Sequence, residues 1–198
     1  MSTSDDRIAG VLLAAGASSR FGDKNKLLVE VAGKPIVRHA AETLVAARLD
    51  PIVAVVGCDA KAVSNALADE RLEIVENPEY RTGQASSLRV GIERIKDRSE
   101  AVVICLGDMP AIDVETIHTL CHAYRTGKGD ALAAAYEGER GNPVLFGERW
   151  FAELLAIDGD IGGRNILREH GSLVETGDPG VRRDVDRPDD LAAIDTRE

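Results

Sequence analysis

The segment of residues 13–26 combines small residues, hydroxyl groups and positive charges, a combination that suits polyphosphate binding. Glycine and alanine let backbone N–H groups approach phosphates closely, and serine hydroxyls add hydrogen-bond donors. Arg20, Lys24 and Lys26 bring positive charge to the same short stretch, and such side chains bind phosphate well. The sequence therefore predicts a nucleotide-binding loop. Its candidate residues are Leu13, Ala14, Ala15, Gly16, Ser18, Arg20 and Lys26.

Two better-known phosphate-binding loops do not fit this segment. The Walker loop ends in Gly-Lys followed by Ser or Thr, whereas Gly22 is followed here by Asp23. The dinucleotide loop requires a glycine two residues after the first, and Ser18 holds that position after Gly16. The alternative interpretation is a plain strand-to-helix turn with solvated charges.

A carboxylate, Asp108, follows a second apolar run and is the predicted ligand of a metal ion. Pro110 restricts Met109 to an extended backbone and prevents an immediate helix, so the carboxylate is held where the run ends. Mg²⁺ binds proteins through one or two carboxylates together with substrate phosphates. We predict Asp108 and Asp186 as the metal ligands and Mg²⁺ as the cofactor. The nearby acids that are expected at the surface or at a helix cap are Asp184 and Asp189.

Further candidates lie in the middle and last third of the chain. Gly83 and Ser87 stand near a predicted helix N-terminus, which favours anions, and they are assigned to the nucleotide site. A capped helix start without ligand is the alternative for them. Asn142, Asp160 and Arg164 are expected to face a second substrate, with Arg164 on its phosphate. His118 and His122 are four residues apart but lack a third ligand, so no zinc site is predicted.

Strand-like and helix-like patterns alternate along the chain and are expected to position these residues. Near-continuous apolar runs predict buried parallel strands. They cover residues 8–14, 52–56, 72–75 and 101–106. Runs with helical spacing predict helices between them. They cover residues 35–47, 60–67, 86–95 and 114–124. The last third is more mixed: strands are expected at 130–136, 142–146, 173–174 and 181–185, and helices at 149–155, 162–170 and 188–194.

The expected fold is one domain over residues 1–198, with three α/β/α layers around a mostly parallel, Rossmann-like sheet. Such alternation implies helices on both faces of the sheet, and ligands then bind beyond the carboxyl ends of the strands. That rule brings the loops after residues 14 and 106 to the same edge.

The acidic composition indicates which classes of partner this protein is expected to lack. The net charge is −10 and the hydrophobic fraction is 44%, which is ordinary for a globular protein. An acidic chain without a basic run repels nucleic acids and anionic membranes, so neither is an expected partner. The polar N-terminus and the absence of a long apolar run predict a cytoplasmic protein.

The loop at 13–22 resembles the nucleotide-binding signature of the nucleotidyltransferases that mature the molybdenum cofactor. The cytidylyltransferase group carries Leu-Ala-Ala-Gly-x-Ser-x-Arg-x-Gly followed by Lys-Leu-Leu, and Lys26-Leu27-Leu28 supplies that ending. The resemblance continues in order over nearly the whole chain, at residues 77–88, 107–110, 140–144, 159–164 and 184–191.

The chain departs from the family pattern at three places. An extra residue after Gly22 leaves Lys24 and Lys26 as alternatives for the phosphate lysine, and we favour Lys26 because the two leucines follow it. Tyr80 replaces a tryptophan and Arg187 replaces a threonine.

The resemblance implies a fold of the nucleotide-diphospho-sugar transferase type. It also implies transfer of CMP from CTP to molybdopterin, with release of pyrophosphate. A phosphate oxygen of the acceptor would attack the α-phosphorus, with Arg20, Lys26 and Asp108 as the catalytic residues. The product would pass to a molybdenum hydroxylase or its chaperone. Residues 14–16 favour the cytidylyl group, because the guanylyl group usually reads Ala-Gly-Gly. The alternatives are guanylyl transfer from GTP, a sugar- or alcohol-phosphate nucleotidyltransferase, and a nucleotide-binding chaperone module without turnover.

Overall fold

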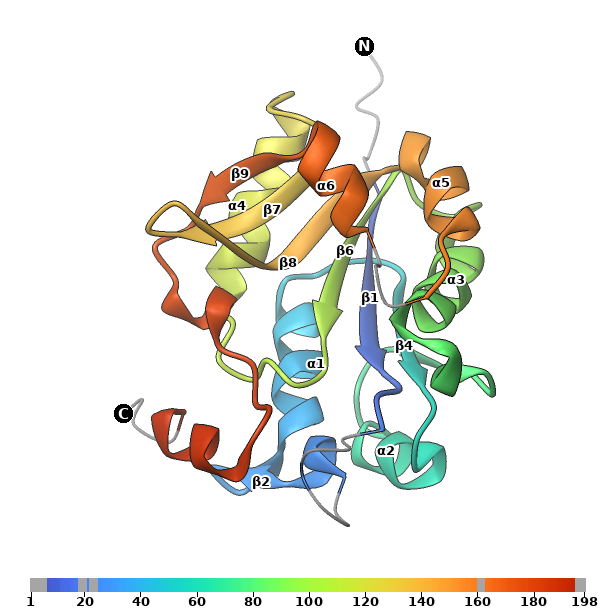
Figure 1. Cartoon of the computed structure of the whole chain (residues 1–198), viewed down its shortest axis with the longest axis vertical. Helices are drawn as coiled ribbons and strands as arrows, with labels where there is room; N and C mark the ends of the chain where they lie inside the picture. Colours follow the sequence, from blue (N-terminus) through green and yellow to red (C-terminus); the bar gives the residue numbers. More distant parts are fainter. Residues whose placement is uncertain (1–6, 18–20, 22–24, 160–162, 195–198) are drawn as a thin grey trace.

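The protein is built on one seven-stranded sheet in the strand order β5-β4-β1-β6-β8-β7-β9 (Figure 1). The computed structural model describes residues 7–17, 21, 25–159 and 163–194. Only β8 runs against its neighbours among the paired strands of this sheet, so the sheet is mostly parallel, as predicted. The strands are β1 (Ile8–Ala14), β4 (Ile52–Val56), β5 (Glu73–Glu76), β6 (Ala101–Leu106), β7 (Ala131–Tyr136), β8 (Glu139–Gly147) and β9 (Ser172–Glu175).

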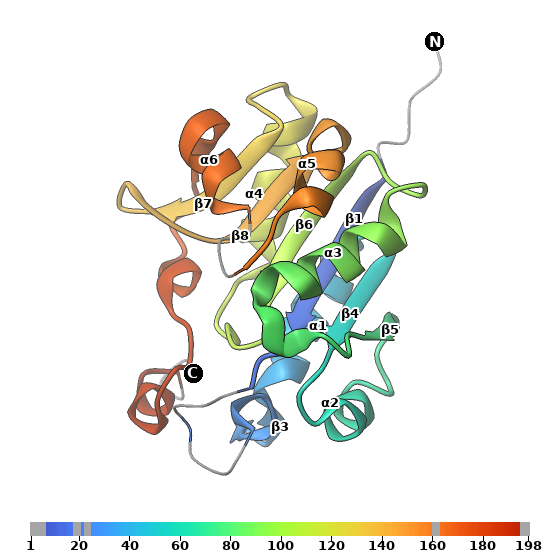
Figure 2. The same ribbon diagram turned by 45° about the vertical axis from the view of Figure 1, so that its right-hand side comes forward.

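Helices cover both faces of the sheet, which confirms the three-layer α/β/α class (Figures 1 and 2). One core packs α1, α2 and α4 on the sheet, and the other packs α3, α5 and α6. The helices are α1 (Ile36–Ala46), α2 (Ala60–Ala66), α3 (Gln84–Ile95), α4 (Val114–Arg125), α5 (Phe151–Ala156) and α6 (Arg164–His170). Short 3-10 turns are η1 (Lys26–Leu28), η2 (Tyr80–Thr82), η3 (Glu148–Trp150), η4 (Pro179–Arg182) and η5 (Pro188–Ala193).

Strand β1 is covered by helices on both faces, which explains why its sequence is apolar throughout. Leu12 contributes to the core under α1, whereas Val11 contributes to the core under α3. Successive side chains of a strand point to opposite faces, so a strand covered on both sides must be apolar at every position. Gly91 in α3 lies so close to β1 that a Cβ there would be 2.6 Å from Val11 Cγ1, which brings the helix close to the sheet.

Three expectations about local structure were wrong or incomplete. Residues 181–185 were predicted as a strand, but η4 and irregular chain occupy them, because Val181 and Val185 are buried without pairing to a sheet. A helix was predicted from Ser86 onward, but α3 begins at Gln84, and the Ser86 hydroxyl donates to the Gly83 carbonyl over 2.8 Å. The short hairpin of β2 (Glu30–Val31) and β3 (Lys34–Pro35) was not predicted, because a strand of two residues is too short to show a hydrophobic period.

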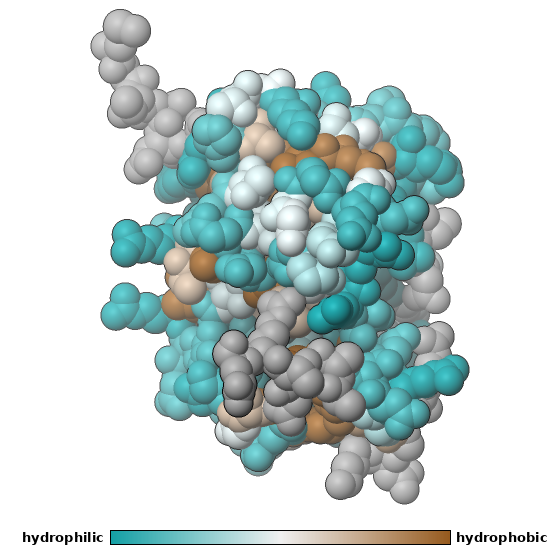
Figure 3. All heavy atoms as spheres, turned by 90° about the vertical axis from the view of Figure 1, so that its left-hand side faces the viewer, coloured by the Kyte–Doolittle hydropathy of each residue, from teal (hydrophilic) through white to brown (hydrophobic). Residues whose placement is uncertain are grey.

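The outer surface is largely polar on the face drawn in Figure 3, where hydrophobic residues form separate small areas. None of the helices in the described residues is long and apolar enough to cross a membrane.

Candidate functional site

The loops after β1 and β6 lie together because these two strands are parallel neighbours, with Leu13 paired to Leu106. The Gly107 amide donates to the Leu13 carbonyl over 2.9 Å, one residue beyond the strand end. A Cβ on Gly107 would lie 3.2 Å from that carbonyl oxygen and 3.3 Å from Ala14 Cβ. Glycine at this position lets the two loops approach closely, which brings Asp108 beside the predicted nucleotide loop.

Lys26 is fixed by a short turn at the end of that loop. It opens η1, and the Asn25 side chain caps this turn by accepting from the Leu27 amide over 3.0 Å. The same buried Asn25 donates to the Cys58 carbonyl over 3.3 Å and to the Asp59 carboxylate over 3.2 Å. The main chain of Lys26 is thus tied to the segment between β4 and α2.

The Lys26 ammonium lies between two carboxylates. Its Nζ is 2.6 Å from Asp108 Oδ2 and 2.9 Å from Asp186 Oδ1. The Lys26 side chain is only 13% exposed. Burial by itself lowers the pKa of Lys26, but the charges and hydrogen bonds of Asp108 and Asp186 outweigh it and raise the pKa above its ordinary value. The lysine therefore stays positively charged at neutral pH.

The C-terminal segment that carries Asp186 is bound to the Asp108 loop. The Val185 amide donates to the Asp108 carbonyl over 2.9 Å. The Asp190 carboxylate then accepts from the Asp186 amide over 2.9 Å and from the Arg187 amide over 2.7 Å. These bonds place a residue from the end of the chain beside one from β6.

A third carboxylate, Asp184, completes an acidic cluster. Ligand oxygens of Asp108, Asp184 and Asp186 all lie within 4.8 Å of one another. Partial burial raises the pKa of Asp184, and the charges of Asp108 and Asp186 raise it further. Asp184 was expected to be a surface or capping acid, but it joins the cluster. Its spacing of two from Asp186 in an extended segment, which puts both on one side, was the available signal.

The donor set of this cluster fits a hard divalent cation. Mg²⁺ and Mn²⁺ prefer oxygen ligands, and Mg²⁺ sites usually combine one or two carboxylates with substrate phosphates. Asp108 and Asp186 were the two predicted ligands, and they share Lys26 Nζ as a partner. Among the described residues, no other group brings three potential metal ligands so close together.

A cleft of about 730 Å³ opens beside the cluster and has the predicted nucleotide loop as one wall. Most of the described residues that the sequence assigned to nucleotide and metal line it. They are Leu13, Ala15, Gly16, Lys26, Gly83, Ser87 and Asp108. Ala14 packs in the core under α1 instead. Ser18 and Arg20 lie outside the described residues, so their predicted contacts stay predictions.

The opposite wall of this cleft is the start of α3, where Gly83, Gln84 and Ser87 line the cleft. A helix N-terminus carries partial positive charge and attracts anions. The buried Asn77 side chain positions this end by donating to the Ser86 hydroxyl over 2.8 Å and to the Ser87 hydroxyl over 3.0 Å. Ser87 is therefore part of the helix start as well as of the cleft.

The lining of the cleft also includes residues that were not predicted for the site, among them Cys58, Tyr80 and Arg81. Arg81 Nε donates to the Tyr80 hydroxyl over 3.1 Å. Gly57 allows Tyr80 to approach β4, because a Cβ on Gly57 would lie 2.7 Å from Tyr80 Cβ. Tyr80 occupies the place of the family tryptophan, and that aromatic position was the signal that could have found this part of the cleft.

A second cavity of about 240 Å³ adjoins the cleft, and Leu13, Gln84 and Leu106 line both. Its floor is apolar and includes Ile104 and Phe146. Its other lining residues include Leu88, Val144 and Leu167.

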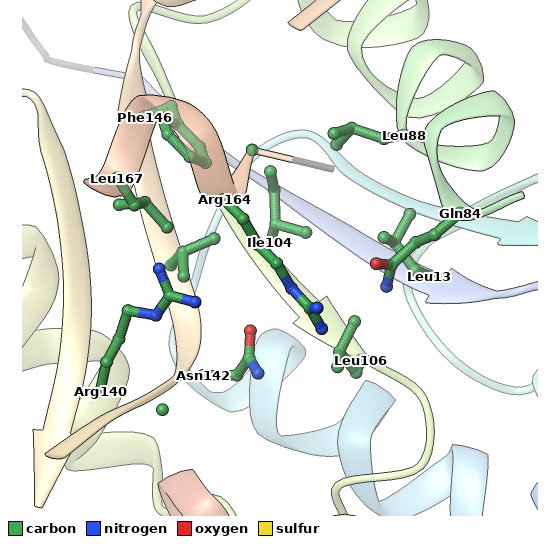
Figure 4. Close-up of a pocket in the computed structure, with 13 residues that line it drawn as sticks. Leu13, Gln84, Leu88, Ile104, Leu106, Arg140, Asn142, Phe146, Arg164 and Leu167 are labelled. Atoms are coloured by element: carbon green, nitrogen blue, oxygen red, sulfur yellow. The ribbon is translucent and has the colours of Figure 1, made fainter. Parts of the chain in front are cut away.

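The polar side chains of this second cavity come from β8, from α6 and from Gln84 of α3. Figure 4 shows the guanidinium of Arg164 extending toward the middle of the cavity, with Asn142 and Arg140 on the β8 side. Asn142 and Arg164 were predicted for the second substrate, and both line this cavity. Asp160 lies outside the described residues. Arg140 lies in the segment 140–144 that resembles the family, but it was not predicted as a site residue. It gives the cavity a second positive charge.

Comparisons with known proteins find relatives of similar sequence and fold. The chain is 30% identical over 190 residues to nicotine blue oxidoreductase from Paenarthrobacter nicotinovorans, covering 90% of this chain and 92% of that protein. It superposes on Rv0371c from Mycobacterium tuberculosis H37Rv with a TM-score of 0.79 and 27% identity, covering 95% and 96% of the two chains. A second structure of Rv0371c is a complex with manganese, with a TM-score of 0.77, 25% identity and coverage of 96% and 100%.

A molybdopterin-guanine dinucleotide biosynthesis protein A from Archaeoglobus fulgidus shares the fold, with a TM-score of 0.70, 17% identity and coverage of 94% and 96%. Residues 10–174 match the MobA-like NTP transferase domain. This match spans the predicted nucleotide loop, the Asp108 loop and the residues that line both cavities. The chain is therefore a nucleotidyltransferase and belongs to the MobA-like NTP transferase family.

Proposed function

We propose that this enzyme transfers CMP from CTP to the phosphate of a molybdopterin-type acceptor, uses Mg²⁺ and releases pyrophosphate. The observation that carries the proposal is Lys26 Nζ, 2.6 Å from Asp108 and 2.9 Å from Asp186 at a cleft that adjoins an arginine-bearing cavity. Phosphate-binding charge and metal-binding carboxylates thus meet where two substrates could lie side by side.

The two cavities suit two different substrates. The larger cleft offers the loop at residues 13–17 and the α3 N-terminus to a triphosphate. The smaller cavity offers an apolar floor for a flat ring system and the Arg140 and Arg164 guanidiniums for a phosphate. A phosphate held by those arginines would lie beside the shared residues Leu13, Gln84 and Leu106, next to the cleft.

The chemistry then requires orientation and charge stabilisation rather than a base. An acceptor phosphate is largely ionised near neutral pH, and phosphoryl transfers depend mostly on positioning and electrostatic stabilisation. Lys26 would bind the triphosphate, Asp108 and Asp186 would hold the Mg²⁺, and the arginines would aim the acceptor oxygen at the α-phosphorus. Bound Mg²⁺ would neutralise charge on the phosphate oxygens.

The choice of CTP rests on Ala14-Ala15-Gly16, the sequence typical of the cytidylyl group. The A. fulgidus protein is named for a guanine dinucleotide, so GTP is the first alternative. Sugar- and alcohol-phosphate acceptors remain the next alternatives, and a nucleotide-binding chaperone module would bind without turnover.

The name of the P. nicotinovorans relative favours a redox reaction as a second candidate. The acidic cluster argues for nucleotidyl transfer, because three carboxylates beside a phosphate loop suit a metal–triphosphate complex. Electron transfer between organic molecules requires no such cluster.

The direct test is pyrophosphate release from each of CTP, GTP, ATP and UTP, with and without molybdopterin, in the presence of Mg²⁺. We expect release with CTP only when the acceptor is present. Release with GTP instead would select guanylyl transfer. Binding of nucleotide without pyrophosphate release under any pairing would refute the enzymatic proposal and favour a binding module or the redox candidate.

Replacing Asp108 with Asn should lower the turnover rate by about 100-fold or more, because a carboxylate that holds the metal is lost. The CTP affinity should change much less. The matched control is Asp113→Asn, a nearby substitution at the cap of α4, where Asn also caps well. Full activity of Asp108→Asn in steady-state assays would refute the metal assignment.

Arg164→Gln and Arg140→Gln should each raise the KM for the acceptor by about tenfold, since a charge-assisted hydrogen bond to phosphate is lost. The KM for CTP should stay within about twofold of wild type. Arg168→Gln is the control, because Arg168 lies on the same helix α6 and is 68% exposed. A rise in the KM for CTP without a change for the acceptor would place the second substrate elsewhere.

A further inference from the structure

We propose that the Lys26 ammonium is an exchangeable counter-cation: it occupies the metal position between Asp108 and Asp186 until a metal–nucleotide complex arrives, then moves onto the phosphates. The part that concerns nucleotide rests on the function proposed above. The part that concerns the free protein rests on the geometry of the carboxylate cluster alone.

The position of Nζ is the first argument. It is within hydrogen-bond distance of two of the three clustered carboxylates, at 2.6 Å and 2.9 Å. A divalent cation bound by the same oxygens would lie about 2.0–2.6 Å from them. Both cations would then need the same small space, and their charges repel each other. Metal binding therefore requires the ammonium to leave.

The long, flexible side chain of lysine lets the ammonium leave the carboxylates. An ammonium on a flexible four-carbon stem can change partners while its backbone stays in place. Here the backbone is held by Asn25, which caps η1 and reaches the segment between β4 and α2. The side chain also lines the nucleotide cleft together with Gly16 and Gly83. Phosphate oxygens in that cleft would offer the displaced ammonium new partners.

The exchange reduces the excess of negative charge at each stage. In the free protein the lysine neutralises carboxylates that would otherwise repel one another. In the complex the divalent ion takes over the carboxylates, and Lys26 neutralises phosphate. A free metal ion gains less, because it must displace the lysine into water. The cleft would therefore select a metal that arrives with a nucleotide over the metal alone.

The experiment is a titration of purified full-length protein with Mn²⁺, in which free Mn²⁺ is measured by electron paramagnetic resonance. It is run on wild type, Lys26→Met and Lys26→Arg, with and without a non-hydrolysable CTP analogue. Lys34→Met is the matched control, since Lys34 is exposed and pairs with Glu42 away from the cluster. Circular dichroism checks that each variant is folded, and Lys26→Gln replaces Lys26→Met should the latter not fold.

Without nucleotide, Lys26→Met should bind Mn²⁺ at least about tenfold more tightly than wild type, because the competing charge is gone. Lys26→Arg and Lys34→Met should stay close to wild type. With the CTP analogue the order should reverse, since the variant lacks the phosphate partner. Unchanged or weaker Mn²⁺ binding by the folded Lys26→Met or Lys26→Gln protein would overturn the exchange. Wild type that binds no Mn²⁺–nucleotide complex would instead overturn the proposed function.

Discussion

Like charges crowded at one edge of the sheet are the constraint on which the rest of the structure depends. Three carboxylates within 4.8 Å repel one another, and isolated charges are costly to remove from water. Lys26 relieves this repulsion from inside the cluster. The arrangement thus combines oxygen ligands suited to a divalent ion with a positive charge suited to phosphate.

The fold brings these charges together from distant parts of the sequence. Parallel pairing of β1 with β6 places the loops that carry Lys26 and Asp108 side by side. The hydrogen bond from Val185 to the Asp108 carbonyl then adds the C-terminal acids. The antiparallel strand β8 contributes a different feature, because it carries Arg140 and Asn142 into the neighbouring cavity. Site and second cavity thus depend on strand order more than on any single loop.

Much of this arrangement could be predicted from the sequence because buried parallel strands have a strong signature. Apolar runs at β1, β4 and β6 predicted the sheet, and the sheet predicted which loops would meet. Asp184 and Arg140 were harder to assign, because an exposed Asp and a surface Arg look the same in sequence wherever they point. Asp184 reaches the cluster because the C-terminal segment folds back onto Asp108. Arg140 reaches the second cavity because β8 pairs with β6. The strand predicted at 181–185 was wrong for a related reason: Val181 and Val185 are buried, but a residue can be buried without pairing in a sheet.

The most direct measurement is a crystal structure with Mn²⁺ and a non-hydrolysable CTP analogue, with the metal located by anomalous scattering. The account predicts a single peak within about 2.0–2.6 Å of carboxylate oxygens of Asp108 and Asp186, in contact with a phosphate oxygen, and the triphosphate lying along residues 13–26. A metal bound away from these carboxylates, or a triphosphate outside the cleft between that loop and α3, would contradict it.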